Sequence, residues 1–156
     1  MKIQTGYLYH IKDDFFDIVN DEKLMSNHER GKKRPTYFTI KDNNILWFIP
    51  ISSKVDKYKK ILDKKVEKYG VCNSILIRDV LGHESAILIQ NAFPTLEKYI
   101  DHVHALDNGK PAKVISSICD EILDNFNLML KLKKKGINFF FTDIDKIKKQ
   151  MEDELK

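Results

Sequence analysis

The stretch TYFTIKDNNILWFIPI, residues 36–51, limits what this chain can fold into more than any other part of its sequence. Both of its ends are rich in β-branched and aromatic side chains, which favour β-strands. The polar KDNN between them, residues 41–44, is typical of a tight turn. We therefore expect an antiparallel hairpin of strands 36–40 and 45–51. The open ends of a hairpin lie side by side, so residues just before 36 and just after 51 should meet in space.

Further strands and helices are predicted from the spacing of apolar residues and from capping signals. We expect further strands at residues 3–11, 74–81, 85–90 and 137–141. A short helix or apolar turn is expected at 15–19 and a loop at 20–35. Helices are expected from a cap at Ser52 or Ser53 to a stop at Gly70, at 95–103, at 112–135, and after a cap at Thr142 or Asp143. This order favours an α+β fold, a small antiparallel sheet or barrel with packed helices. The 156 residues fit a single domain, residues 1–156.

The composition excludes several classes of protein. Apolar residues make up 42 % and charged residues 32 % of the chain, which is typical of a globular protein and not of a disordered one. No apolar run approaches the roughly 18 residues that a membrane span requires, and the polar start MKIQTGYLYHIK does not resemble a signal peptide. Cys72 and Cys119 lie far apart, which indicates free thiols. We expect a cytoplasmic protein that does not bind a membrane.

Motifs for cofactors and activated nucleophiles are missing from the sequence. It contains no HExxH, GxxxxGKS, GxSxG or GxGxxG pattern, so neither a metal nor a cofactor is expected. His102 and His104 are predicted to lie on a helix, in a surface or capping role. Cys119 is expected to pack in the core of the long helix at 112–135.

Positive charge is concentrated in the first half of the chain. Residues 1–70 carry 15 Lys and Arg against 10 Asp and Glu, whereas residues 71–156 carry 12 against 13. Within the short stretch HERGKKR, five residues can be cationic: His28, Arg30, Lys32, Lys33 and Arg34. A basic segment of this kind indicates an anionic partner, and a merely solvated loop is the ordinary alternative.

The segment PISSK, residues 50–54, joins the second hairpin strand to the next helix. The hydroxyls of Ser52 and Ser53, the N–H groups of a helix start and the charge of Lys54 together suit an anion. The ordinary alternative is that one serine caps the helix and the lysine is solvated. Hairpin geometry favours the anion site, because it brings the basic loop to the same open end as the two serines.

These motifs resemble those of the toxins of type III toxin–antitoxin systems, the ToxN, AbiQ and CptN group, and the CptN branch is the most similar in length and spacing. The resemblance is most specific over residues 33–54, in KKRPTYF and IPISSK. The segments GYLYHIKDDFF and NAFP, the long helix and the charged terminal helix extend it over nearly the whole chain.

The resemblance implies a strongly bent antiparallel sheet with surrounding helices, similar to the MazF and Kid toxins. It implies a metal-independent endoribonuclease that cuts mRNA and its own antitoxin precursor, and that leaves 2′,3′-cyclic phosphate and 5′-hydroxyl ends. It also implies an RNA antitoxin made as tandem repeats and held as pseudoknots. Toxin and RNA would close into a cyclic protein–RNA complex in which the toxin is inactive.

The same resemblance implies which side chains act. The family's basic residue before the strand matches Lys33, with Arg34 beside it. Its Ser/Thr–Ser cluster with a lysine matches Ser52, Ser53 and Lys54, although here the lysine follows without the intervening residue common in the family. These five are the predicted catalytic residues. The family's N-terminal tyrosine matches Tyr9 or His10. The family's aromatic residue near the loop has no clear match in this chain, and His28 stands near that position. The predicted RNA-contacting residues are Tyr9, His10, His28, Arg30, Lys32 and Tyr37.

RNA cleavage of this type needs a deprotonated 2′-hydroxyl, stabilisation of the phosphorane charge and a protonated leaving oxygen. Lysine, arginine and hydroxyl groups can supply these functions without a metal, and crowded cations can lower a lysine pKa until the amine acts as a base. Two other interpretations stay open. One is a non-catalytic RNA-binding module with the same basic groove, and the other is a small-molecule or protein-binding domain whose charges are incidental.

Overall fold

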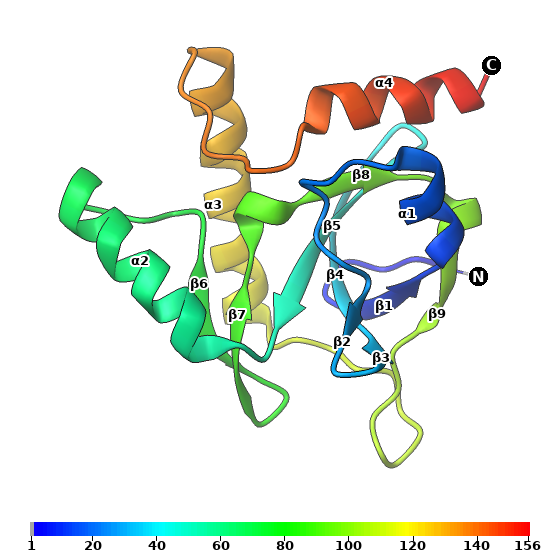
Figure 1. Cartoon of the computed structure of the whole chain (residues 1–156). Coiled ribbons are helices and arrows are strands. Elements are labelled where there is room, and N and C mark those ends of the chain that lie inside the picture. Colours follow the sequence, from blue (N-terminus) through cyan, green and yellow to red (C-terminus); the bar gives the residue numbers. More distant parts are fainter. Residues whose placement is uncertain (1) are drawn as a thin grey trace.

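One antiparallel sheet of seven strands forms the centre of the protein (Figure 1). The computed structural model describes residues 2–156. In sheet order the strands are β6 (Leu76–Val80), β7 (His83–Ile87), β5 (Ile45–Ser52), β4 (Thr36–Asp42), β1 (Leu8–Ile11) and β9 (Ile100–Val103), while β8 (Phe93–Thr95) also pairs with β5. The predicted α+β class is confirmed. The barrel alternative is wrong, because the sheet is open, with β6 at one end of the strand order and β9 at the other.

The predicted hairpin is confirmed as β4 and β5, which pair in register from Thr36 opposite Pro50 to Asp42 opposite Ile45. The register shifts between Phe38 and Ile40, and such a bulge bends a strand. Strand β5 is buried along its whole length. It pairs with β8 in its first half and with β7 at its end, so the sheet bends around it.

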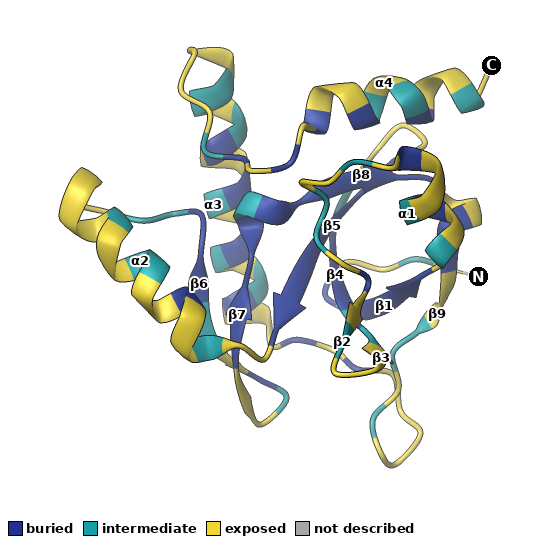
Figure 2. Ribbon diagram, viewed as in Figure 1, coloured by how far each residue is buried: buried dark blue, intermediate teal, exposed yellow. Residues whose placement is uncertain are grey.

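Helices cover the sheet and complete the main core. In α3 (Ser116–Lys134), Ile122, Phe126 and Met129 are fully buried, and the Phe126 ring centroid lies 5.6 Å from that of Trp47. Helix α4 (Ile144–Glu154) lies against β8, and α1 (Asp13–Val19) inserts Phe15 beside Phe93. Figure 2 shows this division, with buried residues in the strands and on the inner helix faces.

Helix α2 (Val55–Tyr69) begins three residues after β5 ends, next to the open end of the hairpin. Its Tyr58 packs in a second, smaller apolar cluster with Ile75, Ala86 and Leu88. The opposite face of the helix is exposed (Figure 2). Among the described residues, no helix has the length and apolar character needed to cross a membrane.

Two predicted elements have a different conformation. The segment 95–103 is not helical: Thr95 ends β8, a single 3-10 turn follows at Glu97–Tyr99, and β9 begins at Ile100. Here pairing of β9 with β1 outweighs the helical spacing of apolar residues. Residues 137–141, predicted as a strand, form an irregular segment that buries Phe140.

Other elements differ in their limits. The first strand begins at Leu8 and not at residue 3, because Gly6 has a positive φ of 97° that interrupts extended backbone. Helix α3 begins at Ser116 and not at 112. The predicted loop 20–35 contains a small hairpin of β2 (His28–Glu29) and β3 (Lys32–Lys33). Of the two alternative caps of the last helix, Asp143 is confirmed, since its side chain accepts from the Lys146 N–H.

Candidate functional site

The β2–β3 hairpin brings the basic segment to the open end of the β4–β5 hairpin. In its register, His28 lies opposite Lys33 and Glu29 opposite Lys32. Arg30 and Gly31 form the turn, with φ values of 55° and 77°. The Arg34 N–H then donates to the Asn27 carbonyl at 2.6 Å, which closes the base of the small hairpin. The prediction that residues before 36 lie close to residues after 51 is therefore confirmed. Glu29 makes the direct contact, with Ser52 and Ser53.

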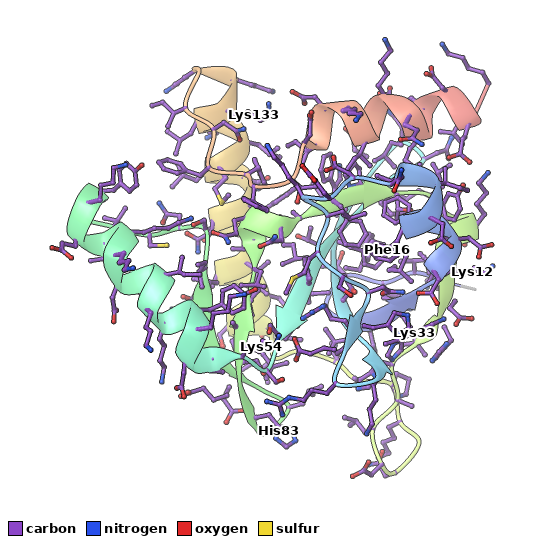
Figure 3. All side chains as sticks on the ribbon, in the orientation of Figure 1. Lys12, Phe16, Lys33, Lys54, His83 and Lys133 are labelled. Atoms are coloured by element: carbon purple, nitrogen blue, oxygen red, sulfur yellow. The ribbon has the colours of Figure 1, made fainter. Side chains whose placement is uncertain are left out.

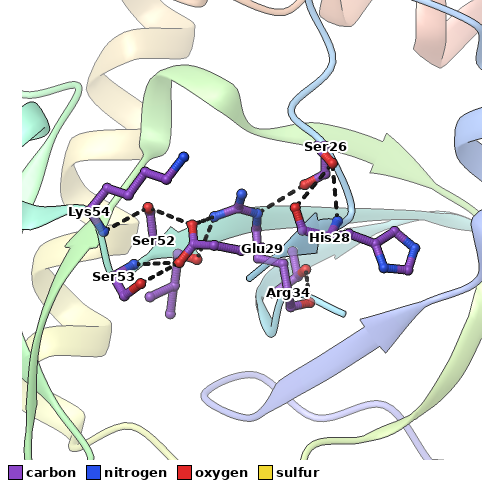
Figure 4. A network of polar contacts seen from close by, with 9 residues as sticks. Ser26, His28, Glu29, Arg34, Ser52, Ser53 and Lys54 are labelled. Atoms are coloured by element: carbon purple, nitrogen blue, oxygen red, sulfur yellow. Dashed lines mark hydrogen bonds and ion pairs between the residues drawn. The ribbon is translucent and has the colours of Figure 1, made fainter. Parts of the chain in front are cut away.

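The Glu29 carboxylate is the centre of a polar network at this point (Figure 4). Its Oε2 accepts from Ser52 Oγ at 2.8 Å and from Arg34 Nη1 at 2.7 Å. Its Oε1 accepts from the Ser53 N–H at 3.0 Å and from Ser53 Oγ at 2.5 Å. Three of the five predicted catalytic residues thus converge on one carboxylate, which sequence analysis did not single out. Glu29 is the only acidic residue in HERGKKR, and it was overlooked because the predicted anion site was based on the cationic residues of this segment.

Arg34 is held inside the protein by more than this ion pair. Its side chain is 6 % exposed. Its Nε donates to the Ser26 carbonyl at 3.0 Å, and Nη1 also donates to the Ile51 carbonyl at 3.1 Å. Arginine suits this position because its planar group donates in several directions at once. Its orientation is therefore fixed by backbone on both sides of the network.

Hydrogen bonding and charge keep Glu29 ionised. Burial alone would raise the pKa of this carboxyl group. The hydrogen bonds from Ser53 and Ser52 and the charge of Arg34 outweigh burial and lower the pKa to about 2. The network therefore contains a carboxylate, not a carboxylic acid, throughout the neutral range.

The two serines do not cap α2 in the predicted way. The N-cap position is Lys54, which makes no side-chain capping hydrogen bond. Instead Ser52 Oγ accepts from the Lys54 N–H at 3.1 Å while donating to Glu29. Ser52 is buried and Ser53 is exposed, so only the second hydroxyl lies at the protein surface.

Lys33 lies on the other side of the small hairpin from the serines. Successive residues of a strand point to opposite faces, so Lys33, which pairs with His28, lies on the other face of the small hairpin from Glu29. The Lys33 ammonium lies 3.3 Å from Asp101 Oδ2 on β9. In Figure 3, Lys54 lies at the start of α2 and Lys33 lies towards β1 and β9. A shared phosphate for Lys33 and Ser53 stays a prediction.

The predicted RNA-contacting residues fall into two groups. Arg30 and Lys32 are exposed at the tip of the small hairpin, and His28 is exposed with its Nε2 2.8 Å from Asp13 Oδ1. Tyr9 and Tyr37 are 2 % and 1 % exposed. Rings so covered cannot stack on RNA bases, so these two residues were assigned wrongly. Both belong to the hydrophobic core, because β1 and the first half of β4 are buried on both faces.

His10 belongs to a cluster of three histidines that the sequence did not reveal. Strand β9 places His102 opposite His10, and the two rings stack at 4.7 Å. His10 Nε2 lies 2.7 Å from His104 Nδ1. Burial, followed by the charges of His104, His102 and Lys33, lowers the pKa of His10 to about 4. The helix predicted for His102 and His104 is wrong, because His102 lies on β9 and His104 directly follows that strand. The alternation of HVH was the signal for a strand.

No metal-binding site is present among residues 2–156. They contain no group of three or more His, Cys, Asp or Glu side chains placed to hold one. The three histidines do not form such a group, since His10 and His104 direct ring nitrogens at each other.

The fold of this protein is similar to the folds of two solved structures from type III toxin–antitoxin systems. It is similar to AbiQ, a lactococcal anti-phage endoribonuclease belonging to the type III system, with a TM-score of 0.71 and 16 % identity over 96 % of this chain and 97 % of AbiQ. It is also similar to a structure that describes selective toxin inhibition by a non-coding RNA pseudoknot in bacterial type III systems, with a TM-score of 0.69 and 14 % identity over 98 % of this chain and 99 % of the other.

Sequence comparison adds nothing to this structural likeness. No family model matches the chain, and no curated protein matches it either. The resemblance inferred from KKRPTYF and IPISSK is thus supported by the fold. The greater similarity to the CptN branch stays a prediction.

Proposed function

We propose that this protein is the endoribonuclease toxin of a type III toxin–antitoxin system. The observation that carries the proposal is the convergence of Ser52, Ser53 and Arg34 on one anionic group, in a chain with the fold of AbiQ. Carboxylate and phosphodiester oxygens accept the same charge-assisted hydrogen bonds. Donors that hold a carboxylate here therefore suit the scissile phosphate of RNA.

In the proposed reaction, the 2′-hydroxyl of the RNA attacks the adjacent phosphate and the 5′-oxygen leaves, which gives 2′,3′-cyclic phosphate and 5′-hydroxyl ends. Ser53 and Arg34 bind the non-bridging oxygens and stabilise the charge that develops on them. Ser52 holds the start of α2 in position through Lys54. Lys33 supplies a second cation beside the phosphate or exchanges a proton with the 2′- or 5′-oxygen, and no cofactor takes part.

The proposed partners are RNA molecules. AbiQ is an endoribonuclease, and the second structural neighbour concerns inhibition by an RNA pseudoknot. For this chain we propose an antitoxin of repeated RNA pseudoknots, closed with the toxin into a cyclic complex, and cytoplasmic mRNA as the substrate. Arg30 and Lys32, exposed at the hairpin tip, contact RNA phosphates, and His28 lies beside them.

The test is to incubate the purified protein with RNA in EDTA and to identify the product ends. Cleavage that survives EDTA and leaves 2′,3′-cyclic phosphates supports the proposal. A strict requirement for Mg²⁺ with 5′-phosphate products contradicts it.

A non-catalytic RNA-binding module is the second candidate. The observation in its favour is that Lys33 contacts Asp101 and not Ser53, so the two predicted catalytic groups are not yet assembled. Binding of RNA by both wild-type protein and Ser53→Ala, with no cleavage by the wild type, would support this second candidate.

A further inference from the structure

The donors that the proposed reaction needs are already engaged with Glu29. A serine hydroxyl has one hydrogen to donate, and those of Ser52 and Ser53 both point at this carboxylate. The Ser53 N–H points there too. One hydrogen of Arg34 Nη1 goes to Glu29 and the other to the Ile51 carbonyl. Neither serine hydroxyl, nor the Ser53 N–H, nor Arg34 Nη1 is free for a phosphate oxygen while Glu29 stays in place, so only Arg34 Nη2 could still donate to one.

The position of Glu29 allows its carboxylate to leave. It comes from a hairpin with two residues in each strand and an exposed turn at Arg30 and Gly31. Its side chain is 12 % exposed, whereas Arg34 beside it is 6 % exposed and is anchored to two carbonyl groups. A rotation of the glutamate side chain would therefore open the network without moving the anchored arginine.

We propose that Glu29 is a built-in competitor of RNA: its carboxylate fills the oxyanion site of Ser52, Ser53 and Arg34, and an RNA phosphodiester replaces it. The identity of the incoming anion rests on the proposed function. The structure described here is then the closed state of the site. Two anions cannot share these donors, because a phosphate beside the carboxylate would face like charge at short range. Because only molecules with Glu29 displaced bind phosphate, the apparent affinity for RNA is reduced by the fraction that is open.

Removal of the carboxylate tests this directly. The probe is a fluorescent 2′-O-methyl RNA oligonucleotide of random sequence, which lacks the attacking hydroxyl, and its dissociation constant is measured by anisotropy. Glu29→Ala should bind it at least about tenfold more tightly than the wild type. The matched control is Glu67→Ala, which removes the same charge from the exposed face of α2. Equal affinities of the two variants, or weaker binding by Glu29→Ala, would overturn the proposal.

The wild-type protein provides a second test, because loss of Glu29 leaves Arg34 buried without its carboxylate and can prevent folding. Inorganic phosphate is titrated into ¹³C,¹⁵N-labelled wild-type protein until the Ser53 amide signal stops shifting. The side-chain carboxyl ¹³C signal of Glu29 should move to the value of a solvated carboxylate. A Glu29 signal that stays unchanged at saturation, or a Ser53 amide that never shifts, would overturn the proposal.

Failure of this inference is distinguishable from failure of the proposed function. Tighter RNA binding by Glu29→Ala in a protein that never cleaves RNA supports the competitor role and rejects the endoribonuclease. Cleavage by the wild type together with a lower cleavage rate and unchanged affinity in Glu29→Ala rejects the competitor role and keeps the endoribonuclease.

Discussion

Lys33 and Arg34 are neighbours in the sequence, yet their charges serve opposite sides of the β2–β3 hairpin. The Arg34 guanidinium lies 2.7 Å from Glu29, next to Ser52 and Ser53, whereas the Lys33 ammonium lies 3.3 Å from Asp101 on β9. Arg34 is buried and Lys33 is half-buried. Lys33 and Arg34 therefore have separate consequences for stability and for activity.

We expect Arg34→Ala to destabilise the protein strongly. The substitution removes donors to two backbone carbonyls and leaves Glu29 without its ion partner, and breaking a buried pair typically costs about 3–5 kcal/mol. Urea denaturation measures the free energy of unfolding. Lys59→Ala is the control, because its pair with Glu84 is exposed to solvent and exposed ion pairs contribute little to stability. Similar losses in both variants would show that Arg34 has no special structural role.

Lys33→Ala and Ser53→Ala should each lower RNA cleavage by about 10²-fold or more, because each removes a group proposed to act on the transition state. Both variants should stay folded, since Ser53 is exposed and the Lys33 pair is only half-buried. Single-turnover rates and thermal unfolding check the two expectations. Lys64→Ala, on the exposed face of α2, should keep nearly full activity. Equal loss in all three variants would point to bulk charge and not to a site.

Affinity for the antitoxin RNA should fall steeply with ionic strength. Each phosphate contact adds about 0.7 (single strand) to 0.9 (duplex) to the magnitude of the slope of log affinity against log salt. Lys32→Ala should therefore reduce the slope by roughly that amount, because this lysine is exposed at the hairpin tip. Lys149→Ala, exposed on α4, should leave the slope unchanged. A flat salt response of the wild type would favour a protein or small-molecule partner.

The histidine cluster should make stability depend on pH in the mildly acidic range. The pKa of His10 is about 4 in the folded protein and about 6.5 in the unfolded chain. The unfolded state therefore takes up a proton first as the pH falls. The contribution of neutral His10 to stability is complete above pH 6.5, declines as the pH falls towards 4, and changes no further below that. His104, with its pKa also lowered by burial, acts with the same sign.

Urea titrations at pH 7.5 and pH 5.5 measure this effect. For one histidine of this kind, the free energy of unfolding should drop by about 1.4 kcal/mol between the two values. His10→Gln should show a smaller drop, whereas His83→Gln, exposed at the start of β7, should behave like the wild type. An unchanged drop in His10→Gln would contradict the assignment. Glu29 does not interfere, because the pKa of its carboxyl group is about 2 in the folded protein and 4.5 in the unfolded chain, and both values lie below pH 5.5.

Local sequence determined the elements that depend on nearest neighbours along the chain. The alternation and turn chemistry of residues 36–51 specify the β4–β5 hairpin, and Gly70, with φ of 82°, ends α2 where a left-handed residue is needed. Hairpin connectivity alone also predicts that the basic segment meets Ser52 and Ser53. These inferences succeed because the interactions behind them span only a few residues.

Only the tertiary structure decided which residue of the basic segment contacts Ser52 and Ser53, and where the histidines lie. Glu29 contacts Ser53 because the β2–β3 hairpin folds back over the end of β5. Each strand of this hairpin has only two residues, which is too short to produce a periodic sequence pattern. His10 and His102 are far apart in the chain and meet only because β9 pairs with β1. Strand pairing over long separations depends on the packing of the whole sheet, so the sequence pattern of residues 95–103 by itself favoured a helix.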